Sequence, residues 1–564
     1  MQEIIKSWFK YFIFVGFFGI CINLIYLAVP IYMMIVYDRV LYSFSQATLY
    51  TLGAGVLISL LIMGLMDYLR ARILGQAGDN MAREMMPFVI KSMHEDAAGI
   101  NGHGYTRGLL DLELLRNSIV RGQIFYILDL PWVLFYLGVL YIMHPLVGAV
   151  AVGAVVMVSV FQTLLKILEK KRYTVADVAF QANADFVTTC LNQSELVAGM
   201  GMLPGIMEKY SDRYNKVLAL RSGADAFQSG TGAVIRLLHM TCLAAVFGAG
   251  AYVFFTDAIT AGTIFASVII VVRLFYPFER SLCDMKASIE AMAAYKRLKN
   301  FVNTKKQKKK LSLPVPDGKY DTEAITLALA GRTILHNISF ALEPGETLGI
   351  LGPSSCGKTS LCKVLLGIWP AVAGKVRLDG AELAQWPGDE LGKYMGYLPQ
   401  EAGLFPASVA ENISRFQGEF QGGLKEVDSE KVVKAAQKAG VHEMILKLAN
   451  GYDTKIDQTG KNLAAGQRQL ICLARALYGE PKLVVLDEPH THLDELGLRS
   501  VFLALNNLKK EKITTIVVTD RPNLLLNMDK ILVIKEGQVA MYGPGKDVLN
   551  KLANKQQPQQ AAGV

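Results

Sequence analysis

Two segments in the second half of the chain carry residues suited to phosphate chemistry. Residues 352–359 fit the pattern Gly-x-x-x-x-Gly-Lys-Ser/Thr, and residues 483–488 form an apolar run that ends in Asp487 and Glu488. The backbone N–H groups of a glycine-rich loop and the N-terminus of the helix after it bind phosphate oxygens. Adjacent carboxylates behind a buried strand can hold Mg²⁺ and orient a water molecule. The pair of segments therefore predicts a site that hydrolyses ATP.

Each residue of these segments has an expected role. Lys358 should bridge the β- and γ-phosphates, and the Thr359 hydroxyl and Asp487 should ligate Mg²⁺. Glu488 should orient or deprotonate the attacking water, and Gln400, whose loop lies between the two segments in sequence, could touch both metal and water. The predicted ATP-binding residues are Gly352, Pro353, Ser354, Ser355, Cys356, Gly357, Lys358, Thr359 and Ser360.

The first half of the chain is strongly apolar. The protein has 564 residues, of which 52% are hydrophobic, and a mean hydropathy of +0.30, which favours membrane spans. A spanning helix needs about 20 apolar residues. Six stretches reach or approach that length: residues 11–37, 47–68, 124–143, 146–167, 230–255 and 259–275.

The net charge of +9 does not indicate nucleic-acid binding, because the basic residues are concentrated in two long loops and in residues 305–310. The loops at residues 69–122 and 168–228 carry many Lys and Arg side chains, whereas the other loops carry almost none. The positive-inside rule then places both termini, both long loops and the ATP-binding domain in the cytosol.

The apolar spacing in the long loops predicts that membrane helices continue into the cytosol and end in short transverse segments. The expected fold is a membrane α-helical domain with six spans and long cytosolic extensions, fused to an α/β phosphate-loop domain. We expect the membrane domain over residues 1–300, a basic linker over 301–320, the nucleotide-binding domain over 321–550 and a disordered tail over 551–564.

With these motifs in place, the chain resembles an ATP-binding-cassette exporter half-transporter, and more narrowly the type I secretion exporters of the PrtD kind. The narrower resemblance rests on Val36-Tyr37-Asp38-Arg39-Val40-Leu41, Asp129-Leu130-Pro131-Trp132, Gly199-Met200-Gly201-Met202-Leu203 and Leu473-Ala474-Arg475-Ala476-Leu477-Tyr478, among other segments. It implies a homodimer in the inner membrane, a periplasmic adaptor, a TolC-like outer-membrane channel and an unfolded polypeptide as cargo. It also implies a signature loop that completes the partner's ATP site, here Leu463, Ala464, Ala465, Gly466 and Gln467.

Three positions depart from the family pattern. Ala464 and Ala465 replace the serine and first glycine of the usual Leu-Ser-Gly-Gly-Gln loop, and Asp520 stands where a histidine usually contacts the γ-phosphate. An ionised aspartate cannot donate to phosphate and repels it. We predict slow hydrolysis at two identical sites, or a second subunit with an intact signature loop. An exporter of lipids or amphipathic small molecules, and a regulatory ATP-binding membrane protein, remain alternative functions.

Overall fold

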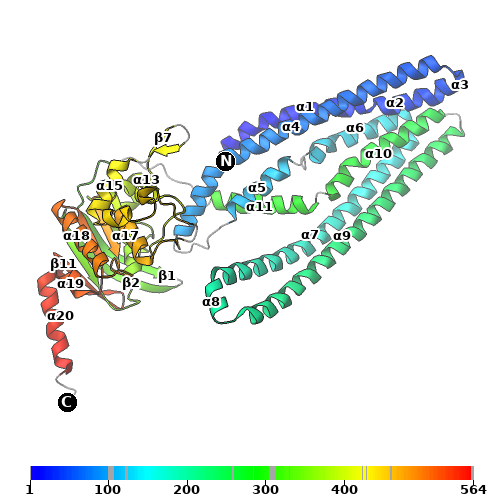
Figure 1. Cartoon of the computed structure of the whole chain (residues 1–564). Coiled ribbons are helices and arrows are strands. Elements are labelled where there is room, and N and C mark those ends of the chain that lie inside the picture. Colours follow the sequence, from blue (N-terminus) through cyan, green and yellow to red (C-terminus); the bar gives the residue numbers. More distant parts are fainter. Residues whose placement is uncertain are drawn as a thin grey trace. The chain divides into compact units, whose positions relative to one another are not determined.

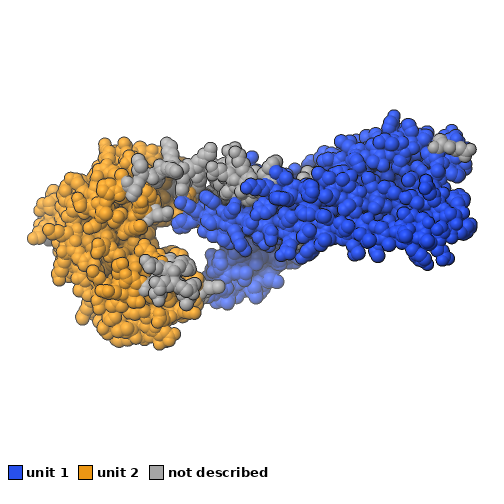
Figure 2. All heavy atoms as spheres, turned by 90° about the horizontal axis from the view of Figure 1, so that it is seen from above, with its two compact units in different colours: residues 1–94, 104–306 blue, residues 95–103, 307–564 orange. Residues whose placement is uncertain are grey.

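The structure, a computed structural model, describes the chain except residues 1, 100–106, 121–124, 257–258, 284, 304–312, 330, 422–423, 427, 458–459, 461 and 561–564. It divides into two compact units, coloured separately in Figure 2. The first comprises residues 1–94 and 104–306, and the second comprises residues 95–103 and 307–564. The predicted basic stretch at residues 305–310 lies outside the described residues.

The first unit is helical throughout its described part (Figure 1). Its elements are α1 (Gln2–Tyr26), α2 (Ala28–Ile35), the π-helix η1 (Val36–Val40), α3 (Leu41–Ser43), α4 (Gln46–Ala98), α5 (Gly108–Val120), α6 (Phe125–Met143), α7 (Pro145–Asn192), α8 (Ser194–Gly199), α9 (Leu203–Phe254), α10 (Ala261–Cys283) and α11 (Met285–Asn303). The short α8 joins α7 and α9, which run side by side.

Among the described residues, five helical stretches are long and apolar enough to cross a membrane: residues 13–43, 46–98, 145–192, 203–254 and 261–278. The remaining predicted span coincides with α6, whose residues 129–143 form a shorter apolar helix. Helices α4, α7 and α9 have 53, 48 and 52 residues. At a rise of 1.5 Å per residue they are about 70–80 Å long, whereas a bilayer core is about 30 Å thick. They therefore extend well beyond a membrane.

Polar contacts, one of them buried, fix the helices of this unit to one another. Arg70 of α4 donates to Asp129 of α6 at 3.1 Å, and both side chains are almost fully buried. Asp38 of η1 accepts hydrogen bonds from the Gly262 backbone N–H at 2.8 Å and the Thr260 hydroxyl at 2.6 Å. Since these groups lie at the start of α10, Asp38 acts as a cap across the bundle, a role that its motif did not reveal.

The second unit contains a parallel sheet, an antiparallel sheet and surrounding helices. Its strands are β1 (Tyr320–Leu329), β2 (Arg332–Leu342), β3 (Thr347–Leu351), β4 (Ala373–Leu378), β5 (Ala381–Glu382), β6 (Met395–Leu398), β7 (Glu419–Gln421), β8 (Leu424–Glu426), β9 (Leu483–Asp487), β10 (Thr514–Val518), β11 (Lys530–Lys535) and β12 (Gln538–Pro544). The six-stranded sheet has the order β12-β11-β3-β10-β9-β6, and β12 is its one antiparallel strand. The four-stranded antiparallel sheet has the order β2-β1-β4-β5, and β7 and β8 form a separate pair.

The helices of this unit are mostly short. They are α12 (Lys358–Leu365), the 3₁₀ helix η2 (Leu383–Gln385), α13 (Gly388–Tyr394), α14 (Val409–Ile413), α15 (Ser429–Lys438), α16 (His442–Leu446), the 3₁₀ helix η3 (Gly451–Asp453), α17 (Ala465–Ala476), α18 (Glu495–Lys510), α19 (Pro522–Leu525) and α20 (Gly545–Gln560). Helix α20 ends at Gln560, and the disorder predicted for residues 551–564 stays a prediction.

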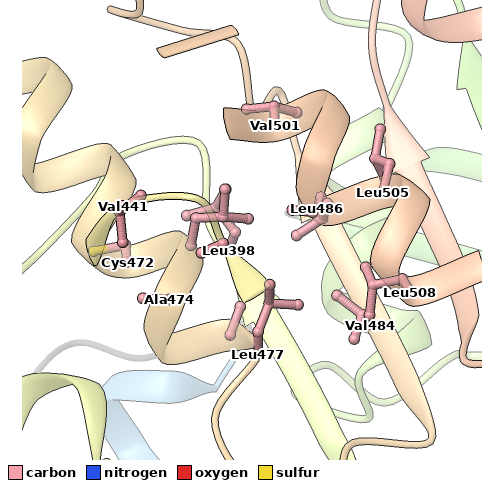
Figure 3. Close-up of a cluster of buried hydrophobic side chains, with 14 of the residues drawn as sticks. Leu398, Val441, Cys472, Ala474, Leu477, Val484, Leu486, Val501, Leu505 and Leu508 are labelled. Carbon is pink, nitrogen blue, oxygen red and sulfur yellow. The ribbon is translucent and has the colours of Figure 1, made fainter. Parts of the chain in front are cut away.

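The central strands of the six-stranded sheet are buried on both faces, as their continuous apolar runs require. All five residues of β9 and of β10 are buried. On one face Val484 and Leu486 pack against Leu505 and Leu508 of α18 and Leu477 after α17 (Figure 3). On the other face Val485 joins a second core that includes α12 and both antiparallel strands β1 and β2. This double burial fixes the strand ends that carry the candidate site.

Candidate nucleotide-binding and hydrolysis site

The site is built at one edge of the parallel sheet, where four neighbouring strands end. Leu351 ends β3, Val518 ends β10, Asp487 ends β9 and Leu398 ends β6. In the register Val518 lies beside both Ile350 and Asp487. The carboxyl ends of adjacent parallel strands form the usual ligand-binding edge of an α/β sheet. The order of the strands therefore brings together the phosphate loop, the carboxylates, position 520 and Gln400, which are far apart in sequence.

The phosphate loop has the backbone that its glycines predict. A Cβ at Gly352 would lie 2.5 Å from the Ile534 backbone oxygen, so only glycine fits there. Gly357 has a φ of +99°, a conformation that other residues rarely adopt. Lys358 begins α12, and its Nζ donates to the backbone oxygens of Gly352 at 2.8 Å and Pro353 at 3.1 Å. The lysine is thus held across its own loop, where it can reach a bound phosphate.

Asp487 is fully buried at the end of β9, and both its carboxylate oxygens lack a hydrogen-bond partner among the described residues. Burial raises its pKa, and the neighbouring Glu488 carboxylate acts in the same direction, while the nearby Thr359 hydroxyl and Lys358 oppose the rise. A buried carboxylate without partners is unfavourable unless a cation or proton compensates it. With Thr359 and Gln400 it offers the hard oxygen donors that Mg²⁺ prefers, so these residues fit the metal.

Glu488 and Gln400 form a direct pair. Gln400 Nε2 donates to Glu488 Oε2 at 3.0 Å, which joins the segment after β6 to the segment after β9. Glu488 has a φ of +50°, in the left-handed region. Such a conformation is unfavourable for a non-glycine residue and is concentrated at functional sites. Its backbone N–H donates to Val518 O at 3.0 Å, which fixes the carboxylate beside the end of β10.

Position 520 has a partner that the sequence did not indicate. Asp520 Oδ1 lies 3.0 Å from His490 Nε2. The His490 side chain is 10% exposed and that of Asp520 is 76% exposed. Burial lowers the pKa of His490, and Arg521 contributes in the same direction, while Asp520 and Glu488 oppose the change. The sequence shows only that residues 488–490 and residues 519–520 each follow an apolar run. The structure shows that these runs are the neighbouring strands β9 and β10, which is why His490 and Asp520 meet.

The signature loop forms the start of α17. Gln467 folds back so that its Oε1 accepts from the Ala464 backbone N–H at 3.0 Å. This is half of a capping box, because the alanine at position 464 has no side-chain oxygen for the amide of residue 467. Within the described part of the chain, no hydrogen bond or ion pair joins residues 463–467 to residues 352–360. The structure therefore brings the other predicted site residues together and leaves this loop apart.

The assembled groups suit phosphoryl transfer to water. A backbone cradle and a lysine would hold the polyphosphate, and an amide and a carboxylate are hydrogen-bonded to each other where a water would be oriented. Mg²⁺ would neutralise charge on the phosphates when bound by Thr359, Asp487 and Gln400. Among the described residues, no group of three or more His, Cys, Asp or Glu side chains is arranged so that it could hold a metal ion.

Comparison with known proteins places this architecture in one class. Residues 335–491 match the ABC transporter family. A bacterial Atm1-family ABC exporter with ATP bound superimposes with a TM-score of 0.85 over 98% of both chains, at 18% sequence identity. A membrane domain fused to an ATP-binding cassette, with this site, defines an ABC exporter that hydrolyses ATP.

Sequence relatives narrow the class. The type I secretion system ATP-binding protein PrsD of Rhizobium meliloti (strain 1021) is 33% identical over 559 residues, which cover 97% of this chain and 93% of that protein. The alpha-hemolysin translocation ATP-binding protein HlyB of Escherichia coli is 24% identical over 94% of this chain and 75% of its own length. The chain belongs to the ABC exporters of type I secretion systems, and it is a multi-pass membrane protein.

Proposed function

We propose that this protein energises the export of an unfolded polypeptide across the inner membrane. The observation that carries the proposal is the similarity to a type I secretion ATP-binding protein along nearly the whole chain, including the membrane unit. The membrane unit is the part of an exporter that contacts cargo, so similarity there bears on the kind of cargo. A match limited to the cassette would support ATP hydrolysis alone.

The roles proposed for the site residues follow from their geometry. Residues 352–360 bind ATP, with Lys358 on the β- and γ-phosphates. Thr359, Asp487 and Gln400 hold Mg²⁺, and Glu488, oriented by its hydrogen bond from Gln400, prepares the attacking water. Residues 463–467 complete the site of a second copy of the chain, because they make no polar contact with the phosphate loop of their own subunit among the described residues.

The assembly proposed is a homodimer in the inner membrane. A periplasmic adaptor and a TolC-like outer-membrane channel would continue the path for the cargo, and both termini and the cassette would face the cytosol. The support is the family membership and the distribution of Lys and Arg over the long loops. Nucleic acid has no part in this proposal.

The test compares proteins released into the medium by cells that express the native chain, Glu488→Gln or Glu443→Gln. Glu488→Gln should abolish release of a specific polypeptide, because an amide cannot accept the proton of the attacking water. Glu443, exposed on α16, is the control for loss of one carboxylate, and its variant should secrete normally. Unchanged secretion in Glu488→Gln, together with altered membrane lipids or drug tolerance, would replace polypeptide export by export of lipids or small molecules.

A further inference from the structure

The loop after β10 holds a negative charge at the point where an ABC site usually presents a histidine to the γ-phosphate. Asp520 follows Thr519 directly after β10, and β10 lies between β3, which leads into the phosphate loop, and β9, which leads into Glu488. A carboxylate there repels a triphosphate, and because the Asp520 side chain is mostly exposed, water weakens this repulsion. The chain nevertheless keeps the lysine, glutamine and glutamate that hydrolysis needs.

His490 is placed to offset this charge. The hydrogen bonds around it assign its protons. Thr519 Oγ1 accepts from the Arg521 backbone N–H at 3.1 Å and lies 3.4 Å from His490 Nδ1. The ionised Asp520 carboxylate can only accept, so the proton of the neutral ring is assigned to Nε2, which lies 3.0 Å from Asp520 Oδ1, and Nδ1 then accepts from the Thr519 hydroxyl. The imidazole therefore donates to the carboxylate.

We propose that His490 is a positioning residue of the ATPase site, whose Nε2–H binds the Asp520 carboxylate and keeps its charge from opposing the γ-phosphate. The inference rests on the nucleotide-site assignment made above and is independent of the cargo. Two residues then occupy the place where an ABC site usually has a single histidine. One is the buried imidazole of His490, on the segment after β9, and the other is the carboxylate of Asp520, on the segment after β10. Because the imidazole is almost fully buried and its partner is mostly exposed, the histidine fixes the position of the pair.

A histidine that acts through Asp520 can be distinguished from one that only stabilises the fold. A structural histidine would stabilise the fold whatever residue stood at position 520. A residue that acts through the Asp520 charge matters only while that charge is present, and only for a ligand that carries a γ-phosphate. Both conditions are measurable.

The experiment is a double-mutant cycle in the full-length protein with His490→Ala, Asp520→Asn and the double variant. For each, we would measure binding of ATP and of ADP, together with kcat and KM for ATP. His490→Ala should weaken ATP binding about three- to tenfold, as expected for loss of a hydrogen bond to a charged but exposed partner. It should leave ADP binding unchanged. In the Asp520→Asn background, His490→Ala should have little further effect on ATP.

Three controls keep the result interpretable. His490→Gln retains an N–H donor for Asp520 and should preserve ATP binding, which also answers the possibility that His490→Ala misfolds. His442→Ala removes a different cassette histidine, one that pairs with Tyr452 at 2.8 Å, and should change neither nucleotide affinity. Lys358→Ala should abolish binding of both nucleotides, and retained binding there would instead contradict the site assignment.

The proposal would be overturned if His490→Ala weakened ATP and ADP binding equally. It would also be overturned if His490→Ala weakened ATP binding by the same factor whether Asp or Asn stood at position 520. In either case His490 would be a structural residue. Unchanged ATP binding in a correctly folded His490→Ala variant would overturn it as well.

Discussion

Asp487 shows how a single residue can favour chemistry at the expense of folding. Its carboxylate is buried at the end of β9, and neither oxygen makes a hydrogen bond of good geometry among the described residues. Burial raises its pKa, and the nearby Thr359 hydroxyl and Lys358 oppose that rise only in part. Leaving a buried polar group unsatisfied costs about 1–3 kcal/mol, and more when it is charged. The residue is therefore unfavourable in the nucleotide-free protein and becomes favourable when a cation is bound.

We predict that Asp487→Asn raises the free energy of unfolding of the nucleotide-free protein by about 1 kcal/mol, since the charge is removed from a buried position. Thermal melting without nucleotide would show the increase. Adding Mg²⁺ and ATP should stabilise the native protein more than the variant, and the variant should not hydrolyse ATP. A variant that melts below the native protein would show that the carboxylate is already compensated.

For individual residues, the sequence predicted the local structure wherever one continuous segment contains the whole motif. The phosphate loop and the Asp487–Glu488 pair are each continuous, and their local structure is as expected. The hydrogen bond from Gln400 to Glu488 and the His490–Asp520 contact join residues on different strands. Such contacts depend on strand order, which a single sequence does not determine.

Among the elements, helix α17 lacks a side-chain cap at its start, since Ala464 occupies the N-cap position. Ala464→Ser would supply the missing acceptor for the amide of residue 467 and complete the capping box with Gln467. We predict a gain of about 1 kcal/mol in stability without nucleotide. The hydroxyl could also donate to the partner's γ-phosphate, so turnover should rise. Ala465→Ser, one position inside the helix, is the control and should give no gain in the melting temperature.

Asp529 joins three elements of the cassette. It accepts from the Thr347 N–H and hydroxyl at 3.0 and 2.8 Å, and from Lys509 Nζ at 2.6 Å, which links β3, α18 and the start of β11. Burial alone would raise its pKa, but the hydrogen bonds from Lys509 and Thr347 outweigh that effect and lower it.

Because the folded-state pKa of Asp529 lies below the unfolded one, its stabilisation is complete above the unfolded pKa and is lost as the pH falls through the folded pKa. We predict that Asp529→Asn lowers the free energy of unfolding by about 1–3 kcal/mol at pH 7. The difference from the native protein should shrink in acid. Melting of the full-length protein over a pH series would check this, with Asp547→Asn, at an exposed position, as the charge-matched control. A difference that stays constant with pH would contradict the prediction.

To a large extent, the helices and strands could be predicted from the hydrophobic pattern of the sequence. Five of the six predicted spans coincide with long apolar helices and the sixth with the shorter apolar helix in α6, because burial in lipid needs only a continuous apolar run. The short pair β7 and β8 was not expected, since three-residue strands carry almost no periodic signal. The capping of α10 by Asp38 was also not foreseen, because the two residues are far apart in sequence.

For the whole molecule, the question is how a half-transporter forms complete ATP sites. The composition predicted a membrane unit followed by a cassette, and similarity to a type I secretion protein covers both. The phosphate loop and the signature loop lie in the same cassette, yet among the described residues no polar contact joins them. Two copies related by a twofold axis would exchange these surfaces, so that each site contains residues of both subunits.

Mixed dimers of two inactive variants test this arrangement. Lys358→Ala removes the phosphate ligand, and Gly466→Asp puts a carboxylate in the signature loop, where a Cβ would also lie 3.0 Å from the His492 carbonyl. Each variant alone has two damaged sites and should be inactive. A mixed dimer has both lesions in one site and none in the other. Dimers purified through two different tags should therefore hydrolyse ATP at about half the native rate if the sites act independently.

The same preparation distinguishes shared sites from sites within one subunit. If each subunit formed its site alone, both sites of the mixed dimer would be damaged and the preparation would stay inactive. Gly466→Asp alone should still bind ATP, because its own phosphate loop is intact, and this binding shows that the variant is folded. Recovery of activity only after the two variants are assembled together would place Lys358 of one copy and Gly466 of the other in one working site, and would make the dimer the unit that hydrolyses ATP.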